Sequence, residues 1–234
     1  MSDEDVKASS VQTTRPLLFV ENVGQFDPRI RFATIGGGTN LRLTDDAFWL
    51  TVLPSERSSR RERLGGVSRP GADATLAPAW VAHLRMSFVG ANTKIQPEPF
   101  APVSSVASYF RGADPTSWHV KVPLWGGVTY RELYPGLDLD VHTDNNANPE
   151  LRLRPVPDGK GEDVRLRIEG AEYVSTNVKS ETDEKVSFFD GLHILTALGR
   201  IFVSLVSSDG ALSKTPRVEQ IDLQTFDVIC SLKR

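Results

Sequence analysis

The sequence predicts an all-β protein, an antiparallel β-sandwich-like domain with long loops and little helix. Short segments such as "IRFATI" and "VRLRIE" alternate apolar and polar residues, which is the period of a strand with one buried face. Gly, Pro, Asn and Asp separate these segments at short intervals, a rhythm typical of sandwiches and barrels. No long segment shows the helical period, so the strands must supply the core.

Length and composition fit this class of fold. The 234 residues suit one large β domain or two small ones. We expect a flexible tail at 1–15 and a β domain at 16–234, formed either as one unit or as two packed subdomains divided near 100–145. Apolar residues make up 39% of the chain, which is enough for an ordinary core.

Charge and hydropathy argue against two classes of partner. The formal charge of −3 leaves no basic excess of the kind that phosphate binding requires, so we expect no nucleic-acid partner. No apolar run reaches the roughly 18 residues of a spanning helix, so we expect no membrane span. The acidic, polar start "MSDEDVKASSVQTTR" lacks the basic and apolar regions of a secretory signal, which favours a cytoplasmic protein or a trimmed chain.

Residues 30–53 predict the first strands. "IRFATI", "LRLT" and "AFWLTVL" alternate, and "GGGTN" at 36–40 supplies a turn, because glycine adopts positive φ at little cost. In the resulting antiparallel meander every second residue faces the core. The predicted core positions are Leu41, Leu43, Phe48, Leu50 and Val52.

Residues 54–79 predict a long surface loop, because they are rich in Arg, Ser, Gly and Pro. A solvated run of charge is the simplest interpretation of the basic segment inside this loop. Two functional interpretations compete with it: a basic contact patch, and a site at 57–69 that a regulatory protease cuts. The candidate binding residues of the patch are Arg57, Arg60, Arg61 and Arg63.

The middle of the chain continues the strand pattern. "WVAHLRMSFVGA" at 80–91 places His83 outward and every second residue toward the core, namely Trp80, Ala82, Leu84, Met86 and Phe88. The stretch "SYFRGADPTSWHVKVPLWGGVTYRELYPGLDLDVH" then predicts strands joined by turns. In its Asp114–Pro115 step, we expect the carboxylate to accept hydrogen bonds from backbone N–H groups about two residues further on. Alternating segments continue to the end of the chain.

The aromatic residues of this stretch have two interpretations. On an exposed face they would form a platform that stacks on sugar rings. In a core they would bury large apolar areas while their hydroxyl and indole N–H groups find partners. Their alternation favours the core, so we predict burial. The set comprises Tyr109, Phe110, Trp118, Trp125, Tyr130 and Tyr134.

Acidic residues alternate in "DLDVHTDNN". Asp138, Asp140 and Asp144 fall on one face of an extended strand, and carboxylate oxygens are ligands that Ca²⁺ prefers. The polar face of a sheet strand, with neighbouring Arg or Lys balancing the acids, is the simpler interpretation. Ca²⁺ at these three residues is the only cofactor that the sequence puts forward, and otherwise we expect none.

No pattern indicates catalysis, so we expect a protein that is not an enzyme. The four His lie in no known catalytic or metal-binding motif. His193 has apolar neighbours, and we predict a structural role for it. The single cysteine, Cys230, excludes an internal disulfide and a zinc site built from several thiolates, and we predict that it is inert.

Several segments resemble a known family. They are "ENVGQFDPRIRFATIGGGTNLRLT", "LRMSFVGAN" and, most specifically, Tyr109–Asp140, where Tyr-Phe-x-Gly-x-Asp-Pro, Val-Pro and Tyr-Pro-Gly-x-Asp-Leu follow in order. Over about residues 16–220 the chain resembles a bacterial domain of unknown function that commonly precedes SBBP-type β-propeller repeats in large secreted or cell-surface proteins. The resemblance implies an all-β, extracellular module with no established catalytic residues.

Together these observations favour a non-catalytic binding or scaffold module whose partner is another protein. Exposed strand edges and the loop at 54–79 are the expected contact surfaces. Two alternatives stay open: a target of a regulatory protease, and a domain that binds carbohydrate or attaches to surfaces through Ca²⁺. The location also stays open, because the resemblance implies the cell surface and the N-terminal sequence does not.

Overall fold

The computed structural model describes residues 17–36, 39–52, 81–144, 148–156, 163–176, 191–208 and 216–231. Strands contain 66% of them, which confirms the all-β prediction. In these ranges the one helical element is a short 3-10 turn, η1 (Pro115–Ser117). No helix there is long and apolar enough to cross a membrane.

The described residues form fifteen strands. They are β1 (Leu18–Glu21), β2 (Phe32–Ile35), β3 (Thr39–Leu43), β4 (Ala47–Val52), β5 (Ala82–Phe88), β6 (Glu98–Tyr109), β7 (His119–Tyr134), β8 (Leu137–Thr143), β9 (Pro149–Pro155), β10 (Val164–Glu169), β11 (Tyr173–Ser175), β12 (Gly191–Thr196), β13 (Gly199–Ser207), β14 (Arg217–Gln220) and β15 (Thr225–Cys230).

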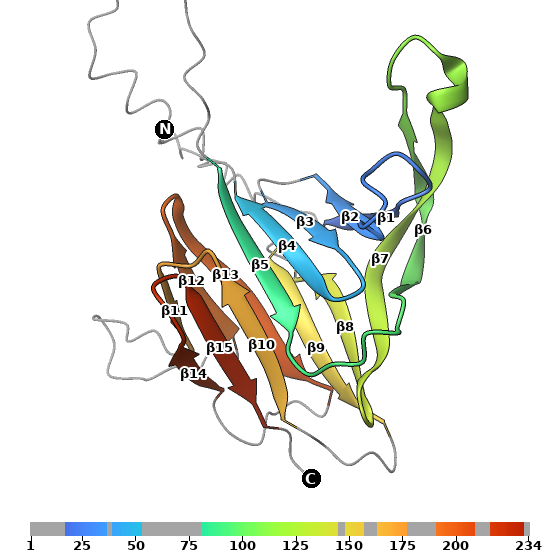
Figure 1. The fold of residues 1–234 in the computed structure, drawn as a ribbon. Helices are drawn as coiled ribbons and strands as arrows, with labels where there is room; N and C mark the ends of the chain where they lie inside the picture. The colour runs from blue at the N-terminus through green and yellow to red at the C-terminus, as the bar shows by residue number, and fades with distance from the viewer. Residues whose placement is uncertain are drawn as a thin grey trace, which may run out of the picture.

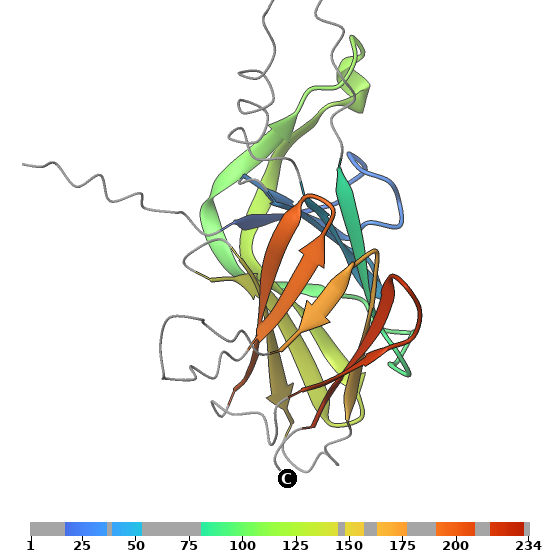
Figure 2. The same cartoon turned by 90° about the vertical axis from the view of Figure 1, so that its left-hand side faces the viewer.

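These strands form one continuous hydrogen-bonded sheet. Its order is β11-β12-β13-β9-β8-β7-β1-β2-β3-β4-β5-β10-β15-β14, with β6 attached to β7. The sheet curls until it is nearly closed and resembles a barrel (Figures 1 and 2). The predicted sandwich is corrected accordingly, because a sandwich needs two separate sheets and here the ladder continues from β5 to β10 and from β9 to β13. The β9–β13 pair is also parallel, whereas the sequence predicted antiparallel pairing.

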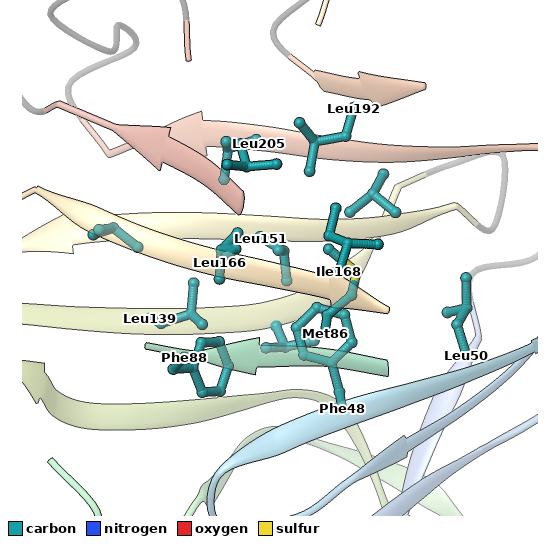
Figure 3. Packing of buried hydrophobic residues seen from close by; sticks show 14 of the residues in the cluster. Phe48, Leu50, Met86, Phe88, Leu139, Leu151, Leu166, Ile168, Leu192 and Leu205 are labelled. Carbon is teal, nitrogen blue, oxygen red and sulfur yellow. The ribbon is translucent and has the colours of Figure 1, made fainter. Parts of the chain in front are cut away.

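The main core lies inside the curled sheet. Leu41, Leu43, Phe48 and Leu50 are fully buried there, as the alternating pattern predicted. Figure 3 shows side chains from strands far apart in the sequence gathered in this core. Full burial of one such side chain stabilises the fold by about 1.5–3 kcal/mol. The core therefore draws on every part of the sheet.

The strands β6 and β7 extend beyond the body of the sheet as a two-stranded arm (Figures 1 and 2). Strand β1 pairs with β7 at Leu124 and Trp125, whereas β6 accompanies β7 as far as His119. We call residues 103–124 the arm, and the residues 110–118 that join its strands the arm tip.

A small second core holds the base of the arm. Val122 and Leu124 of β7 are buried against Val20 of β1 and Ala33 of β2. Val20 and Ala33 belong to this second cluster and not to the main core. The arm is therefore packed against the meander at its base and projects from it.

Candidate functional site

The arm tip presents an aromatic pair to solvent. Phe110 is 63% exposed and Trp118 is 38% exposed, and their rings meet edge to face with centroids 5.3 Å apart. Val106 and Val120, on the strands next to the tip, are also exposed. The end of the arm thus carries a cluster of apolar side chains outside both cores.

Hydrogen bonds within the arm tip fix its shape. The Asp114 carboxylate accepts from the backbone N–H of Thr116 at 2.9 Å, which confirms the predicted Asp-Pro turn. The Ser117 hydroxyl lies 2.7 Å from the Asp114 carbonyl oxygen, and the Trp118 indole N–H donates to the Gly112 carbonyl at 3.3 Å. These bonds hold the aromatic pair in place within the free protein.

The loop between β1 and β2 braces the arm next to its tip, at the last pair of β6 and β7, Tyr109 and His119. The Phe26 ring meets the Tyr109 ring edge to face, with centroids 5.5 Å apart. The His119 ring lies over Gly24, where an added Cβ would come within 2.9 Å of a ring carbon. Gly24 also has a φ of +116°, a conformation that favours glycine. The arm and this loop are therefore built to fit each other.

Side chains of the Glu-Asn-x-Gly-Gln segment shape that loop. The Asn22 side-chain oxygen accepts from the backbone N–H groups of Gly24 at 3.0 Å and Phe26 at 3.1 Å. Its amide donates to the Ile30 carbonyl at 2.7 Å. The Gln25 amide donates to the carbonyl of the last β1 residue at 2.6 Å. The segment that carries part of the family resemblance is thus a loop-forming motif.

The free edge of β6 is poorly suited to adding another strand. Pro99 and Pro102 have no N–H to donate, and the pairing register with β7 shifts between Val103 and Val106 and again before Tyr109. Prolines and bulges of this kind prevent edge-to-edge pairing in natural sheets. The edge of β6 is therefore poorly suited to the strand-edge contact that the sequence predicted.

A groove of about 690 Å³ opens on the outer side of β3, β4 and β5. Its wall is formed by residues 27–31, and Trp49, which is 41% exposed, lies in its floor. Arg42 of β3 and Arg85 of β5 are the cross-strand neighbours of Trp49. The Arg85 guanidinium lies 5.8 Å from the Trp49 ring centroid. We call this feature the Trp49 groove.

Ion pairs occupy most of the charged side chains of the Trp49 groove. The pairs are Arg29–Asp27 at 3.0 Å, Arg31–Asp45 at 2.8 Å and Arg85–Asp46 at 3.0 Å. Hydrogen bonding to Arg29 lowers the pKa of Asp27 to about 2. Arg42 also lines the groove, and the part of the chain that the structure describes offers it no ion pair.

Tyr130 supports the groove from below. Its side chain is fully buried in the main core, and its hydroxyl donates to the Thr44 carbonyl at 2.8 Å. Thr44 begins the turn that carries Asp45 and Asp46 into the groove. Burial raises the pKa of Tyr130 well above its ordinary value, and the charges of Asp45 and Asp46 raise it further. The phenol is therefore a neutral donor under this turn.

The three acids proposed for Ca²⁺ have protein partners. Arg154 lies 3.0 Å from the Asp138 carboxylate and 3.3 Å from that of Asp140, so it balances both, as the simpler interpretation expected. The Asp144 carboxylate accepts from the backbone and the side chain of Asn148 at 2.8 and 3.0 Å. Across the described ranges, no three acids, His or Cys converge as a metal-binding group. Ca²⁺ binding here stays a prediction.

The aromatic residues divide between core and surface. Tyr130 and Tyr134 are buried, as predicted. For Phe110 and Trp118 the predicted burial is wrong. They lie on the arm tip, beyond the end of β1, so no strand on that side of β7 covers them. The alternating pattern of a strand is the same whether or not a neighbouring strand covers it, so alternation could not reveal that the arm projects.

Two other predicted structural residues are enclosed in the fold. Cys230 is buried, and burial raises the pKa of its thiol to about 12, so the thiolate nucleophile is absent at neutral pH. His193 packs against Phe202 with ring centroids 5.0 Å apart. Burial lowers the pKa of His193, and the Arg200 charge lowers it further.

The His193 shift predicts a dependence of stability on pH. The unfolded chain takes up a proton near pH 6.5 while the folded protein resists it, so the free energy of unfolding should fall as the pH drops below about 6.5. Urea unfolding at about pH 7.5 and 5.5 measures this loss, and a His193→Gln variant should lose less than the wild type. Equal losses in the two proteins would contradict the assignment.

Several predicted features lie outside the described residues. They are the tail at 1–15, the loop at 54–79 and its candidate binding residues Arg57, Arg60, Arg61 and Arg63. The basic contact patch and the protease site at 57–69 therefore stay predictions.

Sequence analysis missed Trp49 and Arg42. Both alternate with buried residues, since Leu41, Leu43 and Leu50 face the core while Arg42 and Trp49 are exposed. Large aromatic residues are uncommon at the outward positions of strands. Trp49 could therefore have been recognised from the sequence as a candidate binding residue.

The comparisons with known proteins identify a family without assigning an activity. Residues 19–187 match the family described as "Domain of unknown function (DUF7948)". No curated protein and no solved structure matches the chain. The matched region contains the loop motif around Asn22, the arm and the strands that line the Trp49 groove. Because the match covers more than half of the chain, the protein belongs to the DUF7948 family.

Proposed function

We propose that this domain is a non-catalytic binding module that docks another protein through its arm tip. The observation that carries the proposal is the exposed Phe110–Trp118 pair at the end of a projecting arm. Aromatic residues dominate the energetics of protein interfaces, where Trp is among the commonest residues of high binding energy.

The rigidity of the arm tip supports this role. Asp114, Ser117 and Trp118 bind the tip to itself, and the contacts of Phe26 and His119 hold the strands next to it. A surface that is already ordered loses little conformational entropy on binding. The arm therefore needs no rearrangement to meet a partner.

Charge at the arm tip indicates the chemistry of the partner. Arg111 and Lys121 are exposed near the aromatic pair, and Asp114 is the one acid between them. Residues 110–121 carry a net charge of +1, from Arg111 and Lys121 less Asp114, whereas the chain as a whole has a formal charge of −3, so this stretch differs in sign from the rest of the molecule. We infer a partner protein with an apolar hollow rimmed by acidic residues.

The resemblance to domains that precede SBBP-type propeller repeats supports a role at the cell surface. We infer that the domain acts in a larger surface protein, where the arm joins it to a neighbouring protein. A projecting arm reaches past the bulk of such repeats more readily than a flat face of the sheet does.

Site-specific crosslinking tests the proposal. A photoreactive amino acid at Val120, next to the tip, should give a discrete adduct with one partner protein in cells that express the protein. The same group at Arg200, which is exposed on β13, is the matched control and should give no such adduct. The proposal fails if both positions give the same products or if neither gives an adduct.

A further inference from the structure

We propose that the Trp49 groove binds an acidic saccharide, a sugar unit that carries a carboxylate. The site is separate from the arm tip, and the inference goes beyond the proposed protein docking. Its volume of about 690 Å³ falls within the range of small-molecule sites, about 300–1,000 Å³.

The floor of the groove offers a surface for a sugar ring. Trp49 is 41% exposed on a rigid central strand, and its cross-strand neighbours Arg42 and Arg85 flank it. The apolar C–H groups of a sugar ring pack well against an indole face, which combines a large contact area with a rigid geometry. Trp49 is therefore the stacking residue.

The walls of the groove match the hydroxyl groups of a sugar. Arg guanidinium groups only donate hydrogen bonds and ionised Asp carboxylates only accept them, whereas a hydroxyl does both. A polyhydroxylated ring can therefore bond to both members of pairs such as Arg31–Asp45. A free phosphate ion has only acceptor oxygens when fully ionised, so it could bond to the arginines of these pairs and not to the aspartates.

The charge balance of the groove selects a carboxylate. Four arginines and three aspartates line it, and ion pairs neutralise three of the arginines. The remaining one is Arg42, which stands opposite Trp49 in the ladder. A guanidinium next to a stacking ring holds a carboxylate in a bidentate geometry. The carboxylate of a sugar that is stacked on Trp49 would lie at Arg42.

The groove is also held in shape. Asn22 shapes the loop that forms the wall, and Tyr130 holds the turn that carries Asp45 and Asp46. The Thr44 hydroxyl completes this turn, because it lies 2.9 Å from the Asp46 carboxylate and 2.8 Å from the Ala47 carbonyl oxygen. The proposed ligand contacts thus rest on elements that are ordered within the domain.

Calorimetric titration with uronic-acid oligosaccharides tests this proposal. Galacturonate, glucuronate and mannuronate trimers are compared with the neutral trimers of the same sugars. We expect at least one uronate trimer to bind about tenfold more tightly than its neutral counterpart, the contribution of one charged hydrogen-bonded pair.

Variants of the groove separate its two roles. Arg42→Gln should remove the preference for the charged sugar, and Trp49→Ala should abolish binding of both forms, while Trp49→Phe retains part of it. Arg200→Gln changes the net charge equally at a distant exposed site and should bind as the wild type does. Equal affinity for charged and neutral trimers, no binding of any trimer, or an Arg42→Gln variant with unchanged preference would each overturn the proposal.

Discussion

Replacement of Arg167 by alanine is expected to lower the free energy of unfolding by about 3 kcal/mol. Asp227 of β15 is only 1% exposed, and Arg167 of β10 binds both of its carboxylate oxygens, at 2.8 and 3.0 Å. Removing the guanidinium leaves a buried charge with Arg165 at 4.0 Å as its nearest recorded cation. Breaking a buried pair costs about 3–5 kcal/mol. The Arg167 side chain is itself 37% exposed and Arg165 remains, so the loss lies at the lower end.

Urea unfolding followed by circular dichroism measures the Arg167 effect. Arg165→Ala is the matched control, because it removes the same charge from the same strand but from a contact at 4.0 Å, and it should cost less than about 1 kcal/mol. A double variant, Arg167→Met with Asp227→Leu, should recover most of the loss, since apolar residues of similar volume often replace a buried pair without penalty. If the Arg167→Ala protein is as stable as the Arg165→Ala protein, the ion pair with Arg167 is not needed to stabilise the buried Asp227 carboxylate.

Replacement of Tyr130 by alanine is expected to cost about 4 kcal/mol, and replacement by phenylalanine about 1 kcal/mol. The ring is fully buried and packs against Phe88 with centroids 5.3 Å apart, so its removal leaves a cavity. The phenylalanine variant keeps the ring and loses the hydrogen bond to the Thr44 carbonyl. The alanine variant therefore measures the packing of the ring in the core, and the phenylalanine variant measures the hydrogen bond that supports the turn at Thr44.

Thermal and chemical unfolding of both Tyr130 variants measures these costs. Tyr173→Phe removes a hydroxyl from a residue that is 58% exposed and should leave the stability unchanged. If the Tyr130→Phe protein proves as stable as the wild type, the hydroxyl does not support the turn at Thr44. If Tyr130→Ala costs less than about 1.5 kcal/mol, the ring does not belong to a close-packed core.

Alternation along the chain predicted which residues face the core. Leu41, Leu43, Phe48 and Leu50 are buried and His83 is exposed, because a strand has the same side-chain period in every sheet. Alternation does not say which strands pair. The β5–β10 and β9–β13 contacts join segments far apart in the sequence, so a nearly closed sheet and a sandwich have the same sequence pattern.

Local turn chemistry could also be predicted. Asp114 binds the N–H of Thr116, and Gly136, with a φ of +74°, makes the turn into β8, as their residue types indicated. Whether Trp118 lies in a core or on a surface depends on where β1 ends alongside β7, which is a property of the assembled sheet. The sequence therefore shows the aromatic residues of the arm and the Trp49 groove, but only the structure shows that these residues lie on a projecting arm and in a groove.

The most direct test of protein docking is the affinity of the crosslinked partner for a tip variant. Phe110→Ser combined with Trp118→Ser removes two exposed side chains and one hydrogen bond confined to the tip. Both cores stay intact, so we expect a melting temperature close to that of the wild type. Affinity for the purified partner, measured by calorimetry, should fall by about a hundredfold. This is the change expected when an aromatic residue that contributes about 2–3 kcal/mol to the binding free energy is removed. A folded double variant that binds the partner as tightly as the wild type would contradict the role assigned to the arm.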